Sequence, residues 1–158
     1  MKSMVRDKSP NDPWAAWEAG AVKDAFRLFR AQAEAGDRNA FLNLGYFYDV
    51  GLGTRRSREA ALRWYRRAYR AGDSAAASNI GTVYRDEGRK QLALEWFKRA
   101  ASMGDGDAEV EVAKHHLRSP QNRRLAVSAL KRAVASTQIS EGGREEASAM
   151  LNSLKGAK

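Results

Sequence analysis

The sequence predicts an all-α protein, a short right-handed α-solenoid built from stacked antiparallel helix pairs. A glycine followed by an aspartate recurs at Gly36-Asp37, Gly72-Asp73 and Gly104-Asp105, each time after an amphipathic run rich in Ala, Arg and Lys. A glycine just past a helix can take the left-handed conformation that ends it. An aspartate in the next position can cap the helix that follows. Each pair therefore predicts a tight turn between two helices.

Small side chains recur at fixed distances from these turns. Ala and Gly in such columns let two helices approach closely, and the larger residues fill the space between the close contacts. Self-similarity of this kind is typical of repeat architectures. The aligned columns are Ala40, Ala76 and Ala108; Leu44, Ile80 and Val112; Gly45, Gly81 and Ala113; and, in the second helices, Tyr65, Phe97 and Leu130.

The elements follow from this alignment. The polar start of the chain is expected to be disordered, and Asp12-Pro13 provides an N-cap and a first-position proline. Terminal units of a solenoid are expected to be atypical because they cover an exposed end. We predict disorder over 1–11, one domain over 12–154 and a frayed tail over 155–158. Within the domain we predict a capping hairpin at 12–36, repeats at 37–72, 73–104 and 105–136, a polar linker at 137–143 and a capping helix at 144–154.

The first copy contains a short motif, A-x3-L-G-x2-Y, followed by a Gly-x-Gly loop at 51–53. This pattern resembles the Sel1-like repeat, a relative of the tetratricopeptide repeat, over about residues 24–154. The third copy departs from the pattern, because it has Ala113 where the motif has glycine and it has no tryptophan. The matching positions are Ala40, Leu44, Gly45 and Tyr48 in the first copy, and Ala76, Ile80, Gly81 and Tyr84 in the second.

Composition limits the classes of function. The chain has no cysteine, which excludes disulfides and cysteine-ligated metals. Residues 1–20 lack the apolar core of a signal peptide, and no run approaches the ~20 apolar residues that span a bilayer. A cytoplasmic protein without membrane insertion is expected. The 28 basic and 19 acidic residues give a net charge of +9, which suits nucleic acid, an acidic protein or a well-solvated surface.

The first helix of each pair is expected to line the concave side of the solenoid. The family resemblance implies that a segment of a partner protein binds there. We expect Leu42 and Tyr46 to be its apolar anchors, and Arg85 and Lys114 to orient it by pairing with acidic groups. The mixed composition of this face suits a protein segment better than a phosphate backbone. The alternative is a solvated face without a ligand. The predicted groove residues are Asn39, Leu42, Tyr46, Asp49, Ser78, Thr82, Arg85, Asp107, Val110 and Lys114.

The second helices carry basic residues in two adjacent columns, which we call the basic ladder. Regularly spaced cations can follow a phosphate chain. No aromatic stacking platform accompanies them, and long basic side chains also cover apolar surface and aid solubility. Solvation is therefore favoured over nucleic-acid binding, which makes nucleic acid an unlikely partner. The ladder consists of Arg30, Arg66, Lys98 and Lys131 in one column, and Arg67, Arg99 and Arg132 in the next.

The sequence predicts no enzyme, no cofactor and no metal site. His115 and His116 are adjacent, so on a helix they point ~100° apart and cannot chelate one ion together. No phosphate-binding loop and no nucleophile-base pair is present. We expect a non-enzymatic protein–protein interaction module, an adaptor or regulatory partner. One alternative is an immunity-type neutralising partner of a toxin or enzyme with an acidic surface; another is nucleic-acid binding through the basic ladder.

Overall fold

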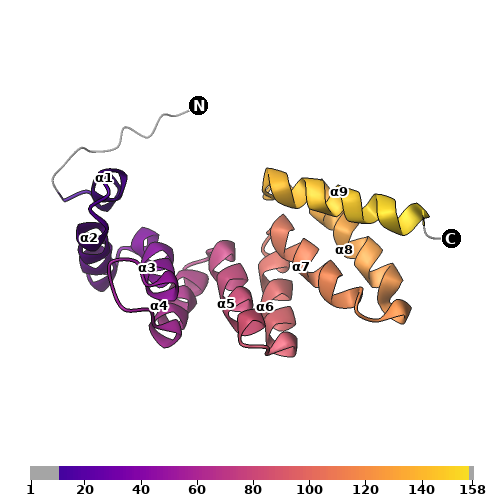
Figure 1. Ribbon diagram of the computed structural model, residues 1–158, viewed down its shortest axis with the longest axis horizontal. Coiled ribbons are helices and arrows are strands. Elements are labelled where there is room, and N and C mark those ends of the chain that lie inside the picture. The colour runs from indigo at the N-terminus through magenta and orange to yellow at the C-terminus, as the bar shows by residue number, and fades with distance from the viewer. Residues whose placement is uncertain (1–10, 157–158) are drawn as a thin grey trace. The chain divides into compact units, whose positions relative to one another are not determined.

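The computed structural model describes residues 11–156 and divides the chain into two compact units, Met1–Ala71 and Gly72–Lys158 (Figure 1). Over 11–156 the secondary structure is helical, with no strand. The predicted all-α class is confirmed. The disorder expected over residues 1–10 and the fraying expected at 157–158 lie outside the described residues. The single domain expected over 12–154 stays a prediction.

The first unit contains four helices that pair in chain order. α1 packs against α2, and α3 packs against both α2 and α4. The predicted capping hairpin therefore corresponds to α1 and α2, and the first full repeat to α3 and α4. The bounds are α1 (Pro13–Glu18), α2 (Val22–Glu34), α3 (Arg38–Val50) and α4 (Arg58–Arg70).

Aromatic rings hold the capping hairpin on the first repeat. The Phe47 ring centroid lies 5.4 Å from those of both Trp17 and Phe29, and 6.3 Å from that of Phe26. Trp14 meets Phe29 edge-on at 5.2 Å. Such pairs each contribute roughly 0.5–1.5 kcal/mol beyond the area they bury. Phe47 is only 4% exposed, so it belongs to the core of the unit and not to its surface.

The second unit contains five α-helices and one 3-10 turn. α5 pairs with α6, α6 with α7, and α7 with α8. α9 packs against both α7 and α8, and so covers the C-terminal end of this unit (Figure 1). The bounds are α5 (Ser74–Asp86), α6 (Lys90–Ser102), α7 (Gly106–His116), the turn Pro120–Asn122, α8 (Arg123–Ala135) and α9 (Glu141–Gly156).

The glycine–aspartate turns form as the sequence predicts. The three glycines have φ of +93° to +98°, the left-handed region that L side chains rarely adopt. The aspartate carboxylates accept hydrogen bonds from backbone N–H groups two or three residues on, at 2.9–3.3 Å. Each aspartate thus satisfies a donor that the start of a helix leaves without a partner. The aspartates are Asp37 before α3, Asp73 before α5 and Asp105 before α7.

The glycine column allows the close helix approach that the sequence predicts. A Cβ placed on Gly45 would lie 2.5 Å from Cδ1 of Tyr65, and one on Gly81 would lie 2.8 Å from Cε1 of Phe97. Both rings are buried. The first helix of each of these two repeats therefore rests its backbone directly on an aromatic ring of the second.

Helix α9 begins three residues before the predicted residue 144. The Ser140 hydroxyl accepts a hydrogen bond from the N–H of Gly143, and its carbonyl accepts from that of Arg144, each at 3.0 Å. The Asp107 carboxylate in turn accepts from the Ser140 N–H at 2.8 Å and hydroxyl at 2.6 Å. This long-range anchor fixes Ser140 as the start of the helix, and no local pattern in the sequence reveals it.

Candidate functional site

A hollow of about 180 Å³ lies in the second unit beside α5 and α7, and we call it the α5–α7 hollow. Five of the predicted groove residues line it, so the fold brings together positions as distant in the sequence as Ser78 and Val110. The lining consists of the predicted Ser78, Thr82, Arg85, Asp107 and Val110, with Phe97, Ala108, Glu111 and Glu146.

The polar groups of this hollow are already ordered by the fold. The Ser78 hydroxyl donates to Oδ2 of Asp105 at 2.5 Å, which ties α5 to the cap of α7. Asp107 is held by Ser140, as described above. Val110 is only 2% exposed, so it forms the floor of the hollow and offers little surface to a partner. Among these predicted residues, Arg85 is exposed, and Thr82 is half-buried with no hydrogen bond from its side chain to another described residue.

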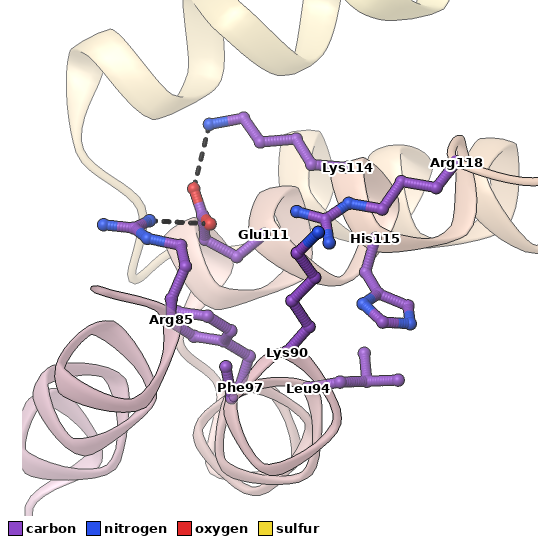
Figure 2. Close-up of a pocket in the computed structure, with 9 residues that line it drawn as sticks. Arg85, Lys90, Leu94, Phe97, Glu111, Lys114, His115 and Arg118 are labelled. Atoms are coloured by element: carbon purple, nitrogen blue, oxygen red, sulfur yellow. Dashed lines mark hydrogen bonds and ion pairs between the residues drawn. The ribbon is translucent and has the colours of Figure 1, made fainter. Parts of the chain in front are cut away.

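Glu111 is the centre of an ion-pair network at the edge of the hollow (Figure 2). Its carboxylate accepts from Nη1 of Arg85 at 2.8 Å and from Nζ of Lys114 at 2.9 Å, and Lys114 also lies 3.0 Å from Glu146 on α9. Burial acts to raise the pKa of Glu111, but the hydrogen bonds from Lys114 and Arg85 outweigh it and hold the pKa below its usual value. Glu111 is therefore ionised at neutral pH.

A second pocket, of about 230 Å³, adjoins the hollow and shares Arg85, Phe97 and Glu111 with it; we call it the α6–α7 pocket. Its floor is apolar and buried, and its rim is basic (Figure 2). Four cationic side chains face a single carboxylate, that of Glu111. The lining consists of Arg85, Lys90, Ala93, Leu94, Phe97, Glu111, Lys114, His115 and Arg118.

The predicted contact residues of the first unit lie on α3. Tyr46 is 47% exposed, Leu42 is half-buried and Asn39 is exposed, so the two apolar side chains form an accessible step. Asp49 is half-buried, and its backbone carbonyl accepts from Nε of Arg56 at 2.6 Å. Asp49 therefore contributes to the loop after α3, while Leu42 and Tyr46 are available to a partner.

Comparison with known proteins gives the family of these repeats. The Sel1 repeat model matches residues 40–73 and 75–105. These two stretches are similar to the Sel1 repeat. It is 34% identical over 66 residues, 41% of its length, to the ERAD-associated E3 ubiquitin-protein ligase component HRD3A of Arabidopsis thaliana, of which it spans only 10%.

Solved structures share the fold of the Sel1 repeats. The Sel1 repeat protein from Oxalobacter formigenes superposes with a TM-score of 0.73 at 24% identity, over 92% of this chain and 66% of that one. The protein c5321, a protective antigen of uropathogenic Escherichia coli, does so with a TM-score of 0.71 at 23% identity, over 92% of this chain and 34% of that one. At these identities the likeness shows the solenoid fold alone.

The basic ladder lies on α2, α4, α6 and α8 and is largely engaged within the protein. Arg66 has a partner within the chain, and four further side chains contact a carboxylate or an aromatic ring. These contacts account for those four cations without a ligand. Arg30 pairs with Glu34 at 2.8 Å, Arg67 lies 4.6 Å over Trp64, Arg99 lies 4.5 Å over Trp96, and Arg132 pairs with Glu109.

The Arg132–Glu109 pair is a structural contact between α8 and α7. Nε and Nη2 of Arg132 donate to the two carboxylate oxygens at 2.6 and 2.9 Å, in the fork geometry that favours arginine at such sites. The Glu109 side chain is only 11% exposed. Reversing the charge at Arg132 would therefore disturb the packing of α8 on α7, so a loss of nucleic-acid binding in that variant would not by itself identify a binding residue.

Residues 11–156 contain no group of three or more His, Cys, Asp or Glu side chains that could hold a metal ion. The ring centroids of His115 and His116 lie 6.2 Å apart, and the two rings line different pockets. Within the same range, no helix is long and apolar enough to cross a membrane.

Sequence reasoning missed Lys90, Arg118, Glu146 and the central role of Glu111. Glu111 and Lys114 are three apart, a spacing at which opposite charges pair on a helix, so that contact had a sequence signal. Lys90 begins α6 and Arg118 follows α7, so neither falls in the first-helix columns from which the groove was predicted.

Proposed function

We propose that the chain is a non-enzymatic protein-interaction module that binds a segment of a partner protein on its first helices. Sel1 repeats generally mediate protein–protein interactions. The observation that supports the proposal is the α5–α7 hollow, where five residues that were predicted from the helical wheel and the repeat alignment line one surface depression. The contact residues would be Thr82 and Arg85 there, and Leu42 and Tyr46 on α3 of the first unit.

The size of the hollow favours a protein segment over a free small molecule. Sites for drug-sized ligands occupy about 300–1,000 Å³, whereas this hollow has about 180 Å³. That volume suits one side chain of an extended segment. The lining also combines one aromatic ring, two hydroxyls and charges of both signs, the mixture found at the rim of protein interfaces.

The partner segment would be acidic. The net charge of +9 speeds the encounter with an acidic surface, and the adjoining α6–α7 pocket is lined by four cations and one carboxylate. Because Arg85 and Lys114 already pair with Glu111, a carboxylate of the partner must compete with Glu111 for them. Glu111 is thus a built-in competitor that lowers affinity and selects for segments with more than one negative group.

The test places a photo-crosslinking amino acid at Tyr46 or at Thr82 of the full chain, in cells of the native organism. The control position is Leu125, which is 53% exposed on α8 and lines neither pocket. We expect the same protein to be linked from positions 46 and 82 and not from 125. Linkage from 125 alone, or linkage to nucleic acid, would reject the first-helix surface.

The linked protein is then purified and its affinity measured by calorimetry. Removing one central contact commonly costs on the order of 2 kcal/mol, or about 30-fold. We expect Tyr46→Ala and Thr82→Trp to weaken binding by about that factor, Leu125→Ala to leave it unchanged, and Glu111→Gln to tighten it. A neutralising partner would show the same pattern together with loss of the linked protein's activity. Circular dichroism confirms that each variant is folded; full affinity of folded Tyr46→Ala and Thr82→Trp contradicts the proposal.

A further inference from the structure

Two cations on the rim of the α6–α7 pocket have no counter-ion within the part of the chain that the structure describes. Arg85 and Lys114 share Glu111, but Lys90 and Arg118 form no ion pair with any residue of the described chain, 11–156. Figure 2 shows Lys90, from the start of α6, and Arg118, from the end of α7, with their charged ends projecting over the same pocket. The fold thus holds two like charges together from different helices without neutralising them.

The imidazole of His115 reports the resulting positive potential. Its pKa is lowered from the usual value first by burial and then by the surrounding cations. The charged groups that act on it from its own helix and from the facing α6 are Arg118, His116, Lys98 and Lys90.

The charge count identifies the class of ligand. An anion with a single charge would leave one of the two free cations unmatched, whereas a dianion matches both. A phosphomonoester carries about −1.5 to −2 charges at pH 7 and three acceptor oxygens. Arginine and lysine donate to phosphate oxygens, arginine as a planar fork and lysine as a point charge.

The floor of the pocket explains what the phosphate is attached to. Leu94 and Phe97 line the pocket, so an apolar stem that enters it meets apolar side chains while the charged end reaches the rim. A pocket of about 230 Å³ holds one side chain of this kind. The pocket also adjoins the α5–α7 hollow, so a segment lying there can place one side chain in it.

We propose that the α6–α7 pocket binds a phosphorylated side chain of the partner segment, with the phosphate between Lys90 and Arg118 and the stem on Leu94 and Phe97. The assignment rests on the proposed function, because the segment that carries the phosphate lies in the adjoining hollow. It makes recognition depend on the phosphorylation state of the partner.

The test uses the full chain and small probes, so it does not require the partner. Phenyl phosphate is titrated while the imidazole signals of His115 and His116 are followed by NMR. Because the phosphate offsets Lys90 and Arg118, we expect the pKa of His115 to rise and that of His116, which lines a different pocket, to stay unchanged. Phenylacetate has a similar stem with one charge, and we expect it to bind at least tenfold more weakly.

Matched variants locate the site. Arg118→Gln and Lys90→Gln should each raise the Kd for phenyl phosphate by roughly tenfold or more, as expected for loss of a charge-assisted hydrogen bond. Arg124→Gln removes the same charge from an exposed position on α8 outside the pocket and should have no effect. Inorganic phosphate, which lacks a stem, should bind more weakly than phenyl phosphate.

Each opposite result overturns the inference. The inference is wrong if phenyl phosphate leaves the pKa of His115 unchanged, or if phenylacetate binds as tightly as phenyl phosphate. It is also wrong if Arg124→Gln weakens binding as much as the pocket variants do. Inorganic phosphate that binds as tightly as phenyl phosphate would indicate a site for the free ion. The two proposals fail separately. If phenyl phosphate does not bind but crosslinking from 46 and 82 succeeds, only the phosphate assignment is wrong. If phenyl phosphate binds and crosslinking fails, the proposed function is wrong, and the pocket binds a phosphate monoester that is not carried by a segment in the hollow.

Discussion

Replacing Gly45 by alanine tests the close approach of α3 to α4. The added Cβ would lie 2.5 Å from Cδ1 and 2.6 Å from Cε1 of Tyr65, whereas carbon atoms at their optimal separation lie ~3.5–4 Å apart. The ring is 1% exposed, so it cannot swing into solvent. A ring or helix must therefore move by about 1 Å within a packed core.

Two effects of opposite sign determine the result. Overpacking a core by one methyl group costs about 1–3 kcal/mol, while alanine favours a helix over glycine by about 1 kcal/mol. With contacts as short as 2.5 Å we take the upper part of the first range. The expected net loss in the free energy of unfolding is about 1–2 kcal/mol, measured by urea denaturation followed at 222 nm.

The third copy suggests the matched control. There the same two columns hold Ala113 and Leu130, both fully buried. Combining Gly45→Ala with Tyr65→Leu reproduces that pair in the first repeat. In the Tyr65→Leu background the same alanine should be neutral or stabilising, which gives a coupling energy of about 1–3 kcal/mol in a double-mutant cycle. A Gly45→Ala variant that is as stable as the parent, with Tyr65 present, would refute the close contact.

Three further predictions concern stability. Asp105→Ala should lower the free energy of unfolding by about 2 kcal/mol and Asp37→Ala by about 1 kcal/mol. Of these two caps, Asp105 alone also accepts a hydrogen bond from a side chain of α5. Thermal melts would show the difference, and equal losses would contradict it. Burial and nearby cations lower the folded-state pKa values of His115 and His116, so the unfolded chain binds protons more readily. The free energy of unfolding should therefore fall as the pH drops through about 6.5. Replacing both histidines by glutamine should make the urea midpoint less dependent on pH between about 7.5 and 5.5. Arg132→Leu should lower the free energy of unfolding by about 1–3 kcal/mol, because it leaves a mostly buried carboxylate without its counter-ion. Arg132→Lys should retain part of that energy. An Arg132→Leu variant whose urea midpoint is unchanged would exclude a structural role.

The sequence predicts what is encoded locally. The turns at Gly36, Gly72 and Gly104 need only a positive φ and an adjacent cap, so their residues reveal them. The glycine and aromatic columns recur at a fixed period, so aligning the repeats is enough to identify the packing partners of Gly45 and Gly81.

The candidate site was predicted less completely, because helical wheels place residues on faces but do not show what covers them. Val110 falls on the correct face, yet neighbouring elements leave it 2% exposed. Asp107 lines the hollow as expected, but its carboxylate also accepts hydrogen bonds from Ser140, 33 positions away. Lys90 and Arg118 meet only because α6 and α7 pack together, which no spacing along the chain encodes.

The anchoring of α9 has a consequence for the length of the chain. Asp107 fixes the start of this helix, and Glu146 from its second turn reaches Lys114 at the edge of the hollow. A version truncated after position 139 would lose one wall of the hollow together with one of the two carboxylates that pair with Lys114. Such a shortened protein would present a wider and more cationic mouth, so the presence of α9 sets both the width and the charge of the surface that a partner would meet.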